Sequence, residues 1–184
     1  MQVAHWMVLV LGSIGIVWVS RPALRAPHSH GFPRFFAWEL ILGLFALNMP
    51  FWFAAAFEPR QLVSWGLLTV SLAMIFLGVR AFHRHGEVDM QRNDPSLVGI
   101  EKTTRLVTAD IYRYIRHPFY SSLLFLAWGI FFKHFSWLGL ALAAAATACL
   151  VLTAKREEQE NIGFFGSPYR DYMQTTRMFI PFLF

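Results

Sequence analysis

Residues 116–132 read RHPFYSSLLFLAWGIFF, two basic side chains followed at once by an almost wholly apolar run. Pro118 suits the first position of a helix, because its missing N–H would have no partner there, and it disfavours helical backbone at His117. We therefore expect a helix that begins at Pro118. Its positive dipole end, beside Arg116 and His117, would suit a carboxylate or phosphate. Alternatively, the basic pair only flanks a membrane span and Tyr120 belongs to an interfacial aromatic belt.

The composition of the whole chain is typical of a membrane protein. Of its 184 residues, 56% are hydrophobic and 15% are charged, which is too apolar for a soluble globular domain. Apolar runs recur at lengths near the roughly 20 residues that cross a bilayer as a helix. The first run lacks the features of a cleaved signal peptide and is interpreted as a retained span. We predict an all-α, polytopic membrane protein with about five spans, at residues 3–19, 35–57, 62–82, 118–132 and 135–154.

Basic residues are distributed unevenly between the predicted loops. Fourteen of the 16 lysines and arginines fall in the first loop, the long third loop and the tail, whereas only Arg60 and Lys133 fall on the other side. The positive-inside rule then places the N-terminus outside, with the C-terminus and the candidate site cytoplasmic. We expect the basic residues behind the formal net charge of +5 to contact lipid head groups, and not nucleic acid. Residues 1–82 are predicted to form a three-helix membrane region and residues 83–184 the region with the candidate site.

The last two predicted spans are expected to pair as a helical hairpin. The fourth span has 15 residues and covers only about 22 Å, short of the roughly 30 Å hydrocarbon core. Gly139 and the run ALAAAATA at 141–148 supply small side chains that let membrane helices approach closely. Because the third loop and the tail share one side of the membrane, RHPFY at 116–120 and EEQE at 157–160 should meet there.

The segment after the fifth span, KREEQENIGFFGSPYRDYMQTTRMFIPF at 155–182, is not typical of a disordered tail. It contains an FF pair, a turn at Gly166 to Pro168, two tyrosines three apart and a closing IPF. We expect an amphipathic tail that folds back and closes a cytoplasmic pocket. Carboxylates and aromatic faces both attract onium groups, so such a pocket would suit a ligand with a sulfonium. The alternative interpretation is that the glutamates are solvated surface charges.

In these features the chain resembles the isoprenylcysteine carboxyl methyltransferase family and the related membrane phospholipid methyltransferases. The resemblance covers about residues 106–184. Asp110 and Ser122 depart from it, because each stands where the family usually has a glycine. The residues that carry the resemblance are Tyr112, Arg116, His117, Pro118, Tyr120, Trp128, Gly129, Glu157, Glu158, Phe164, Phe165, Gly166, Tyr169, Tyr172, Pro181 and Phe182.

The resemblance implies an integral membrane methyltransferase that uses S-adenosyl-L-methionine and a lipophilic acceptor from the bilayer. The expected reaction is isoprenylcysteine-type carboxyl O-methylation, with an arginine as the counter-charge of the acceptor. The implied catalytic residues are Arg116, Glu158 and Arg177. The implied cofactor-binding residues are Val107, Thr108, Tyr112, His117, Pro118, Tyr120, Glu157, Glu158, Tyr169 and Tyr172.

Other functions stay open at this point. An amine acceptor, as in phospholipid N-methylation, would have to lose a proton, which Glu158 or His117 would accept. A membrane reductase of the sterol type has a related hairpin and tail but uses NADPH. A non-enzymatic membrane adaptor would bind neither cofactor.

Two further sequence patterns do not by themselves indicate a ligand site. The pairs His28/His30 and His83/His85 lack carboxylate partners at a fixed spacing, so we predict no metal site. The aromatic residues of the second span either line a prenyl pocket or face lipid: Trp38, Phe45, Phe51, Trp52 and Phe53.

Overall fold

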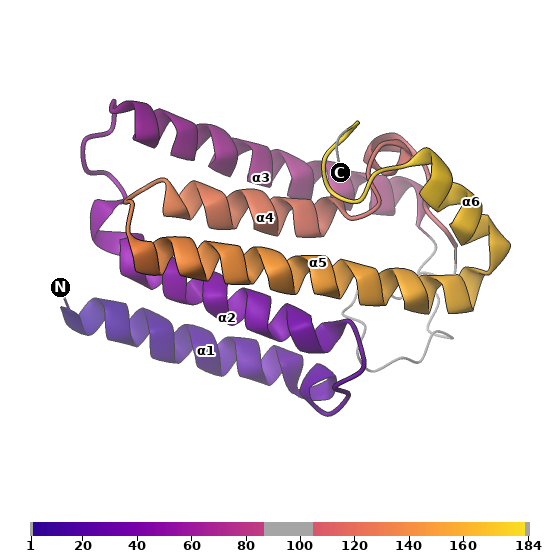
Figure 1. The fold of residues 1–184 in the computed structure, drawn as a ribbon, viewed down its shortest axis with the longest axis horizontal. Coiled ribbons are helices and arrows are strands. Elements are labelled where there is room, and N and C mark those ends of the chain that lie inside the picture. Colours follow the sequence, from indigo (N-terminus) through magenta and orange to yellow (C-terminus); the bar gives the residue numbers. More distant parts are fainter. Residues whose placement is uncertain (1, 87–104, 183–184) are drawn as a thin grey trace.

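The computed structural model describes residues 2–86 and 105–182, and across these ranges the chain is built from helices without a β-sheet. The predicted all-α class is confirmed. The long helices lie side by side as a bundle, and the short C-terminal helix lies at one end of it (Figure 1). The elements in chain order are α1 (Gln2–Leu24), α2 (Gly31–Asn48), η1 (Met49–Phe51), α3 (Pro59–His85), η3 (Asp110–Arg113), α4 (Pro118–Phe131), α5 (Trp137–Phe165) and α6 (Ser167–Thr175).

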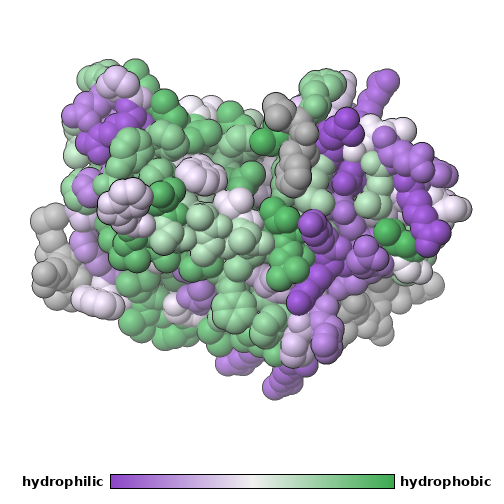
Figure 2. All heavy atoms as spheres, viewed as in Figure 1, coloured by the Kyte–Doolittle hydropathy of each residue, from purple (hydrophilic) through white to green (hydrophobic). Residues whose placement is uncertain are grey.

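Four helices of the described part are long and apolar enough to cross a membrane: α1, α2 together with η1, α3 and α5. The prediction of about five spans is not fully met, because α4 has only 14 residues and covers about 21 Å. Hydrophobic side chains cover the middle of the bundle, and hydrophilic ones gather at the end where α6 lies (Figure 2). Large apolar side chains on α1, among them Trp6 and Trp18, are well exposed, as expected for a surface that faces lipid.

Several helices end at other residues than the predicted membrane spans. The second span was expected at 35–57, but α2 begins at Gly31 and ends at Asn48. Pro50 follows, within a short 3₁₀ turn. The fifth was expected to end at 154, but α5 continues to Phe165. Its polar segment consists largely of Lys, Arg, Glu and Gln, which favour helix as strongly as most apolar residues do. The end of an apolar run therefore does not mark the end of the helix.

The first helix also runs past its predicted limits of 3–19, to Leu24. Arg92 and Lys102, two of the basic residues counted for the orientation, lie outside the described residues. The orientation across the membrane and the division at residue 82 stay predictions.

Polar side chains of α2 and α3 hold the short helix α4 in the bundle. Each donates a hydrogen bond to a backbone carbonyl of α4, an arrangement common between membrane helices. The bonds run from Ser64 to Gly129 (2.7 Å), from Ser71 to Ser122 (2.8 Å) and from Asn48 to Ile130 (2.8 Å). These three hydrogen bonds help to attach α4 to its neighbours, although the helix is short.

The hairpin partners α4 and α5 touch, but each has its main neighbour elsewhere. Helix α4 packs chiefly against α3, and α5 packs chiefly against α2. Ala143 and Ala146 of the small-residue run are completely buried, in one apolar cluster with Ile41 and Leu44 of α2. The small residues therefore serve the contact with α2 at least as much as a pairing with α4.

Lys133, between α4 and α5 at the end of the bundle away from α6, is completely buried. Its Nζ lies 3.4 Å from the centroid of the Trp65 ring and 5.1 Å from that of Trp52. The same atom donates to Gln61 Oε1 at 3.1 Å. The sequence suggested a charge that flanks a span, whereas the structure places this ammonium group inside an aromatic cage.

Candidate functional site

Backbone hydrogen bonds join the entry of α4 to the tail after α6. The N–H groups of Arg116 and His117 donate to the carbonyls of Arg177 (2.8 Å) and Met178 (3.1 Å), and the Arg177 N–H donates to Tyr114 (3.0 Å). The bonds form an isolated parallel bridge at this point. The tail thus folds back on the start of α4, as its sequence suggested.

Gly166 reverses the chain between α5 and α6. Its φ of +69° lies in the left-handed region, which favours glycine, and its N–H donates to the Ile162 carbonyl at 3.0 Å. Helix α6 then places the buried rings of Tyr169 and Tyr172 against the end of α5. The predicted turn at Gly166 to Pro168 therefore positions both tyrosines.

Arg116, His117 and Glu158 form a nearly buried charged group at the junction of α4 and α5. Arg116 Nε donates to Glu158 Oε1 at 2.6 Å, and His117 Nε2 lies 3.3 Å from the same oxygen. Arg116 Nη1 donates to the Thr176 carbonyl at 2.6 Å and contacts the Met173 carbonyl at 3.3 Å. The predicted meeting of RHPFY with the acidic pair is observed, and the Arg116 side chain is held by protein groups.

A cavity of about 730 Å³, including its opening to solvent, lies beside this charged group. The Tyr120 hydroxyl donates to Glu157 Oε2, and the Glu157 carboxylate remains 21% exposed. The lining residues come from α3, the segment before α4, and helices α4 to α6: Phe82, Arg105, Leu106, Val107, Tyr112, Arg116, His117, Pro118, Phe119, Tyr120, Glu157, Asn161, Phe165, Tyr169 and Tyr172. The wall thus combines a carboxylate with many aromatic rings.

The two tyrosines of α6 are neutral hydrogen-bonding groups in this wall. Burial raises the pKa of Tyr169 and of Tyr172 well above the usual value, and the nearby Glu157 carboxylate raises that of Tyr169 further. The Tyr172 hydroxyl donates to the Tyr112 carbonyl at 2.7 Å. The phenols therefore add aromatic surface to the cavity without adding charge.

Most residues predicted to bind a cofactor line this cavity. The structure places Thr108 in an exposed position away from the lining. Glu158 lies behind the wall, in contact with Arg116 and His117. The side chain of Arg177 is exposed and lines a separate groove with Arg113. The predicted residues found in the lining are Val107, Tyr112, Arg116, His117, Pro118, Tyr120, Glu157, Tyr169 and Tyr172.

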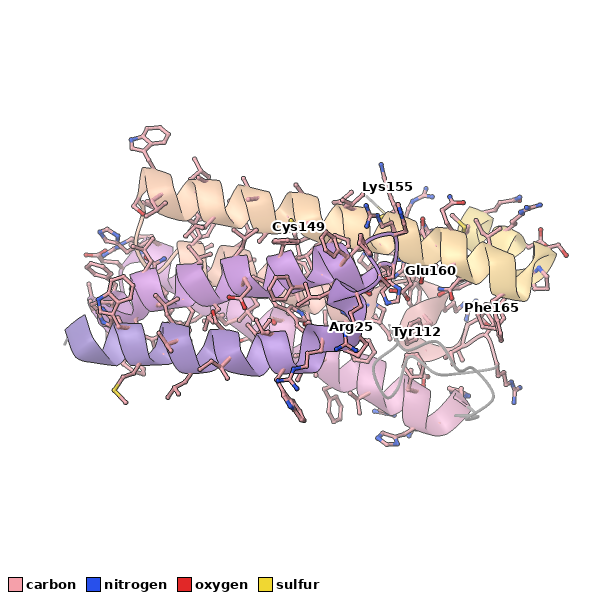
Figure 3. The ribbon with its side chains drawn as sticks, turned by 90° about the horizontal axis from the view of Figure 1, so that it is seen from below. Arg25, Tyr112, Cys149, Lys155, Glu160 and Phe165 are labelled. Carbon is pink, nitrogen blue, oxygen red and sulfur yellow. The ribbon has the colours of Figure 1, made fainter. Side chains whose placement is uncertain are left out.

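Several lining residues were not predicted as site residues. Asn161 follows Glu157 by one helical turn and shares its face, a relationship that periodicity could have revealed. Phe119 and Phe165 belong to motifs that were singled out, RHPFY and FFG. No sequence pattern indicated Phe82 or Arg105. Phe82 reaches the cavity through the packing of α3, and Arg105 reaches it through the segment before η3. Tyr112 and Phe165 lie at one end of the molecule, whereas Cys149 lies midway along α5 (Figure 3).

The two departures from the family pattern have clear structural settings. Asp110 has a φ of +54°, a conformation that glycine adopts without strain and that Asp tolerates better than most residues. Its carboxylate lies 3.3 Å from His85 Nε2. Ser122 is buried, accepts the hydrogen bond from Ser71 and donates to the Phe119 carbonyl at 2.7 Å. Neither side chain lines the cavity.

The histidine pairs do not form metal centres in the described part of the chain, where no group of three His, Cys, Asp or Glu residues is placed to hold an ion. His30 is completely buried, and its Nδ1 lies 2.5 Å from Glu160 Oε2. The backbone N–H of His30 also donates to Glu160 Oε1 at 2.9 Å. Glu160 therefore fixes the turn between α1 and α2 to the polar end of α5, the region where Figure 3 labels it.

The fold and the cavity define an all-helical membrane protein with a polar, aromatic cavity at one end of its bundle. The sequence profile of the family described as phospholipid methyltransferase matches residues 62–163, more than half of the chain. The chain belongs to this family. The resemblance to membrane methyltransferases inferred from its motifs is thereby confirmed.

One curated relative is methanethiol S-methyltransferase 1 from Bradyrhizobium diazoefficiens. It is 30% identical to this chain over 122 residues, which cover 62% of this chain and 41% of the relative. The chain therefore spans about two fifths of the length of that protein. No solved structure matches the chain.

Proposed function

We propose that this protein transfers a methyl group from S-adenosylmethionine to a lipophilic acceptor, with the cofactor in the cavity between α4, α5 and α6 on the cytoplasmic side. The observation that carries the proposal is the partly exposed Glu157 carboxylate surrounded by aromatic rings. Family membership supports the same reaction class.

The residues present fit a cofactor that bears a sulfonium. The Glu157 carboxylate attracts a cation through its charge, and the faces of Tyr112, Tyr120 and Tyr169 attract it through their quadrupoles. When bound, S-adenosylmethionine supplies a methyl group activated for transfer. Such a transfer depends mainly on alignment, and the buried pair of Arg116 and Glu158 serves it by keeping the entry of α4 fixed against α5.

The kind of acceptor that the cavity suits depends on which positively charged side chains can reach it. A carboxylate acceptor, as in isoprenylcysteine-type O-methylation, requires a counter-charge. Arg116 donates through Nε and Nη1 to protein oxygens, and the Arg177 side chain lies in a separate groove. Two arginines line the cavity, Arg105 and Arg116, so the counter-charge for a carboxylate would come from one of them.

A thiol or amine acceptor is the second candidate, and the geometry favours it. Such a nucleophile needs no cation beside it but must lose a proton. The Glu157 carboxylate, which accepts a hydrogen bond from Tyr120, is placed in the cavity wall to receive that proton. The name of the relative, a methanethiol S-methyltransferase, and the family description, phospholipid methyltransferase, point to acceptors of these two kinds.

Ligand titration of the purified protein tests the cofactor. S-adenosylhomocysteine lacks the positive charge of S-adenosylmethionine, so Glu157→Gln should weaken binding of S-adenosylmethionine about tenfold and that of S-adenosylhomocysteine much less, since a partly desolvated onium contact is worth on the order of 1.4 kcal/mol. Asp171→Asn is the matched control, because this exposed carboxylate does not line the cavity. Saturable binding of NADPH alone would refute the proposal, and so would binding of none of the three.

To identify the acceptor, the purified protein is incubated in native lipid with methyl-labelled S-adenosylmethionine. The molecule that gains the label is the acceptor. Defined assays then offer a prenylated cysteine, phosphatidylethanolamine and methanethiol in turn. Arg105→Gln should weaken labelling if the acceptor is the carboxylate, and it should leave labelling of a thiol or amine unchanged. Labelling of the thiol or amine supports the second candidate if it survives Arg105→Gln and is lost in Glu157→Gln even when S-adenosylmethionine saturates that variant.

A further inference from the structure

A surface groove outside the cofactor cavity collects arginines at the polar end of α3. It is lined by Leu77, Arg80, Asp110, Ile111, Arg113 and Tyr114. A second groove adjoins it and shares Arg113 and Tyr114. That second groove adds Gln174, Thr175, Arg177 and Phe182. Together the two grooves form one surface across α3, η3 and the tail, which we call the arginine groove.

The arginine groove carries uncompensated positive charge. Arg80, Arg113 and Arg177 are exposed, and within the described ranges their side chains make no hydrogen bond or ion pair. Asp110 is the acidic residue in the lining, and its carboxylate is already near His85. Three guanidinium groups that have no hydrogen-bond acceptor among residues 2–86 and 105–182 therefore line one groove, which suits an anion.

The groove lies where α3 leaves the hydrocarbon. Residues 62–79, the uncharged part of the predicted span 62–82, cover about 27 Å, close to the roughly 30 Å apolar thickness of a bilayer, so we expect Arg80 at head-group level. Phe76 and Leu77, one turn earlier on the same face, are exposed apolar side chains. Tyr114 and Phe182, with ring centroids 6.3 Å apart, add the aromatic surface typical of a membrane interface. Lipid-facing and cationic surfaces are thus continuous.

We propose that the arginine groove binds the phosphate of an anionic phospholipid, with its acyl chains along α3 at Phe76 and Leu77. Arginine suits this role because its planar fork of donors matches phosphate oxygens. Arg80 and Arg113 hold the phosphate, and Arg177 adds charge from the tail. A soluble phosphate ester shares the head-group chemistry but lacks the chains that Leu77 and Phe76 would contact. The site is separate from the cofactor cavity, and the inference does not depend on the proposed reaction.

Lipid titration of the delipidated full-length protein, followed by native mass spectrometry, tests this site. Phosphatidylglycerol should bind more tightly than phosphatidylcholine. In Arg80→Gln/Arg113→Gln the affinity for phosphatidylglycerol should fall about fivefold for each arginine removed. The control Arg25→Gln/Arg170→Gln removes the same charge from exposed arginines outside the groove and should leave the affinity unchanged. Glycerol 3-phosphate, which carries no acyl chains, should bind far more weakly than the lipid.

A second variant covers the case in which the double variant does not fold. Asp110→Asn removes the negative charge of the groove and keeps a residue that tolerates positive φ, so phosphatidylglycerol should bind more tightly to it. Equal affinity for the two lipids in the wild type would overturn the proposal. So would a control variant that loses as much affinity as the groove variant, or glycerol 3-phosphate binding as tightly as the lipid.

Discussion

Arg116 Nε and Glu158 Oε1 lie 2.6 Å apart, although the two residues are separated by 42 positions in the chain. Their side chains are only 9% and 6% exposed. This pair ties the entry of α4 to the first polar turns of α5, and the cavity opens beside it. Its two charges are therefore part of the framework of the site.

Removing one charge of this pair should cost more than removing both. Arg116→Gln or Glu158→Gln leaves an uncompensated buried charge and should lower the free energy of unfolding by about 3 kcal/mol. The double variant Arg116→Gln/Glu158→Gln should be more stable than either single variant. Unfolding of the detergent-solubilised protein measures both. Strictly additive losses would show that the two side chains act independently.

The conformation at Asp110 predicts which substitutions are tolerated there. At a φ of +54°, a β-branched side chain is strained, so Asp110→Val should destabilise the protein by about 1–2 kcal/mol. Asp110→Gly should be close to neutral, because relief of strain offsets the greater freedom of glycine in the unfolded chain. Thermal unfolding of the two variants provides the measurement. Equal stability of Val and Gly at this position would contradict the left-handed backbone.

If the aromatic rings stabilise the ammonium group of Lys133, substitutions of Lys133 and Trp65 should have non-additive effects on the free energy of unfolding. A desolvated cation over an aromatic face is worth about 2 kcal/mol. In a double-mutant cycle of Lys133→Met and Trp65→Leu, we expect an interaction of this size in the free energy of unfolding. A parallel cycle of Arg60→Gln with Trp65→Leu serves as the control, because Arg60 contacts Glu58 and the Lys133 carbonyl instead of this ring. A coupling near zero for Lys133 would exclude the cage.

Tyr172 should make stability fall at alkaline pH. Burial raises its pKa in the folded state above the ordinary value of 10.0, so the neutral phenol contributes stability that is fully present below that value. The contribution is lost as the pH rises from about 10 through the folded-state pKa. Tyr172→Phe should lose about 1 kcal/mol at neutral pH, because the Tyr112 carbonyl loses its donor. Above pH 10 this variant should show the smaller further decline, and an identical alkaline decline in both proteins would contradict the burial of this hydroxyl.

The sequence predicted which residues meet at the cavity better than it predicted the helix limits. Proline at the first helical position fixed the start of α4, and glycine at the end of α5 fixed the turn into α6, because each residue acts through its own backbone. The continuation of α5 beyond residue 154 was missed, since hydropathy does not record helix propensity. The burial of Lys133 and the engagement of Arg116 by the tail were missed for another reason. Both depend on segments far apart in the chain that meet only after packing.

Helix α5 has 29 residues and is about 43 Å long, well beyond the roughly 30 Å hydrocarbon thickness. Because it continues without a break from lipid into the acidic turns at Glu157 and Glu158, tilting of its apolar part moves those carboxylates as well. Membrane helices accommodate thinner or thicker bilayers by tilting. We therefore expect the position of the acidic groups relative to the head groups to depend on the acyl-chain length of the surrounding lipid.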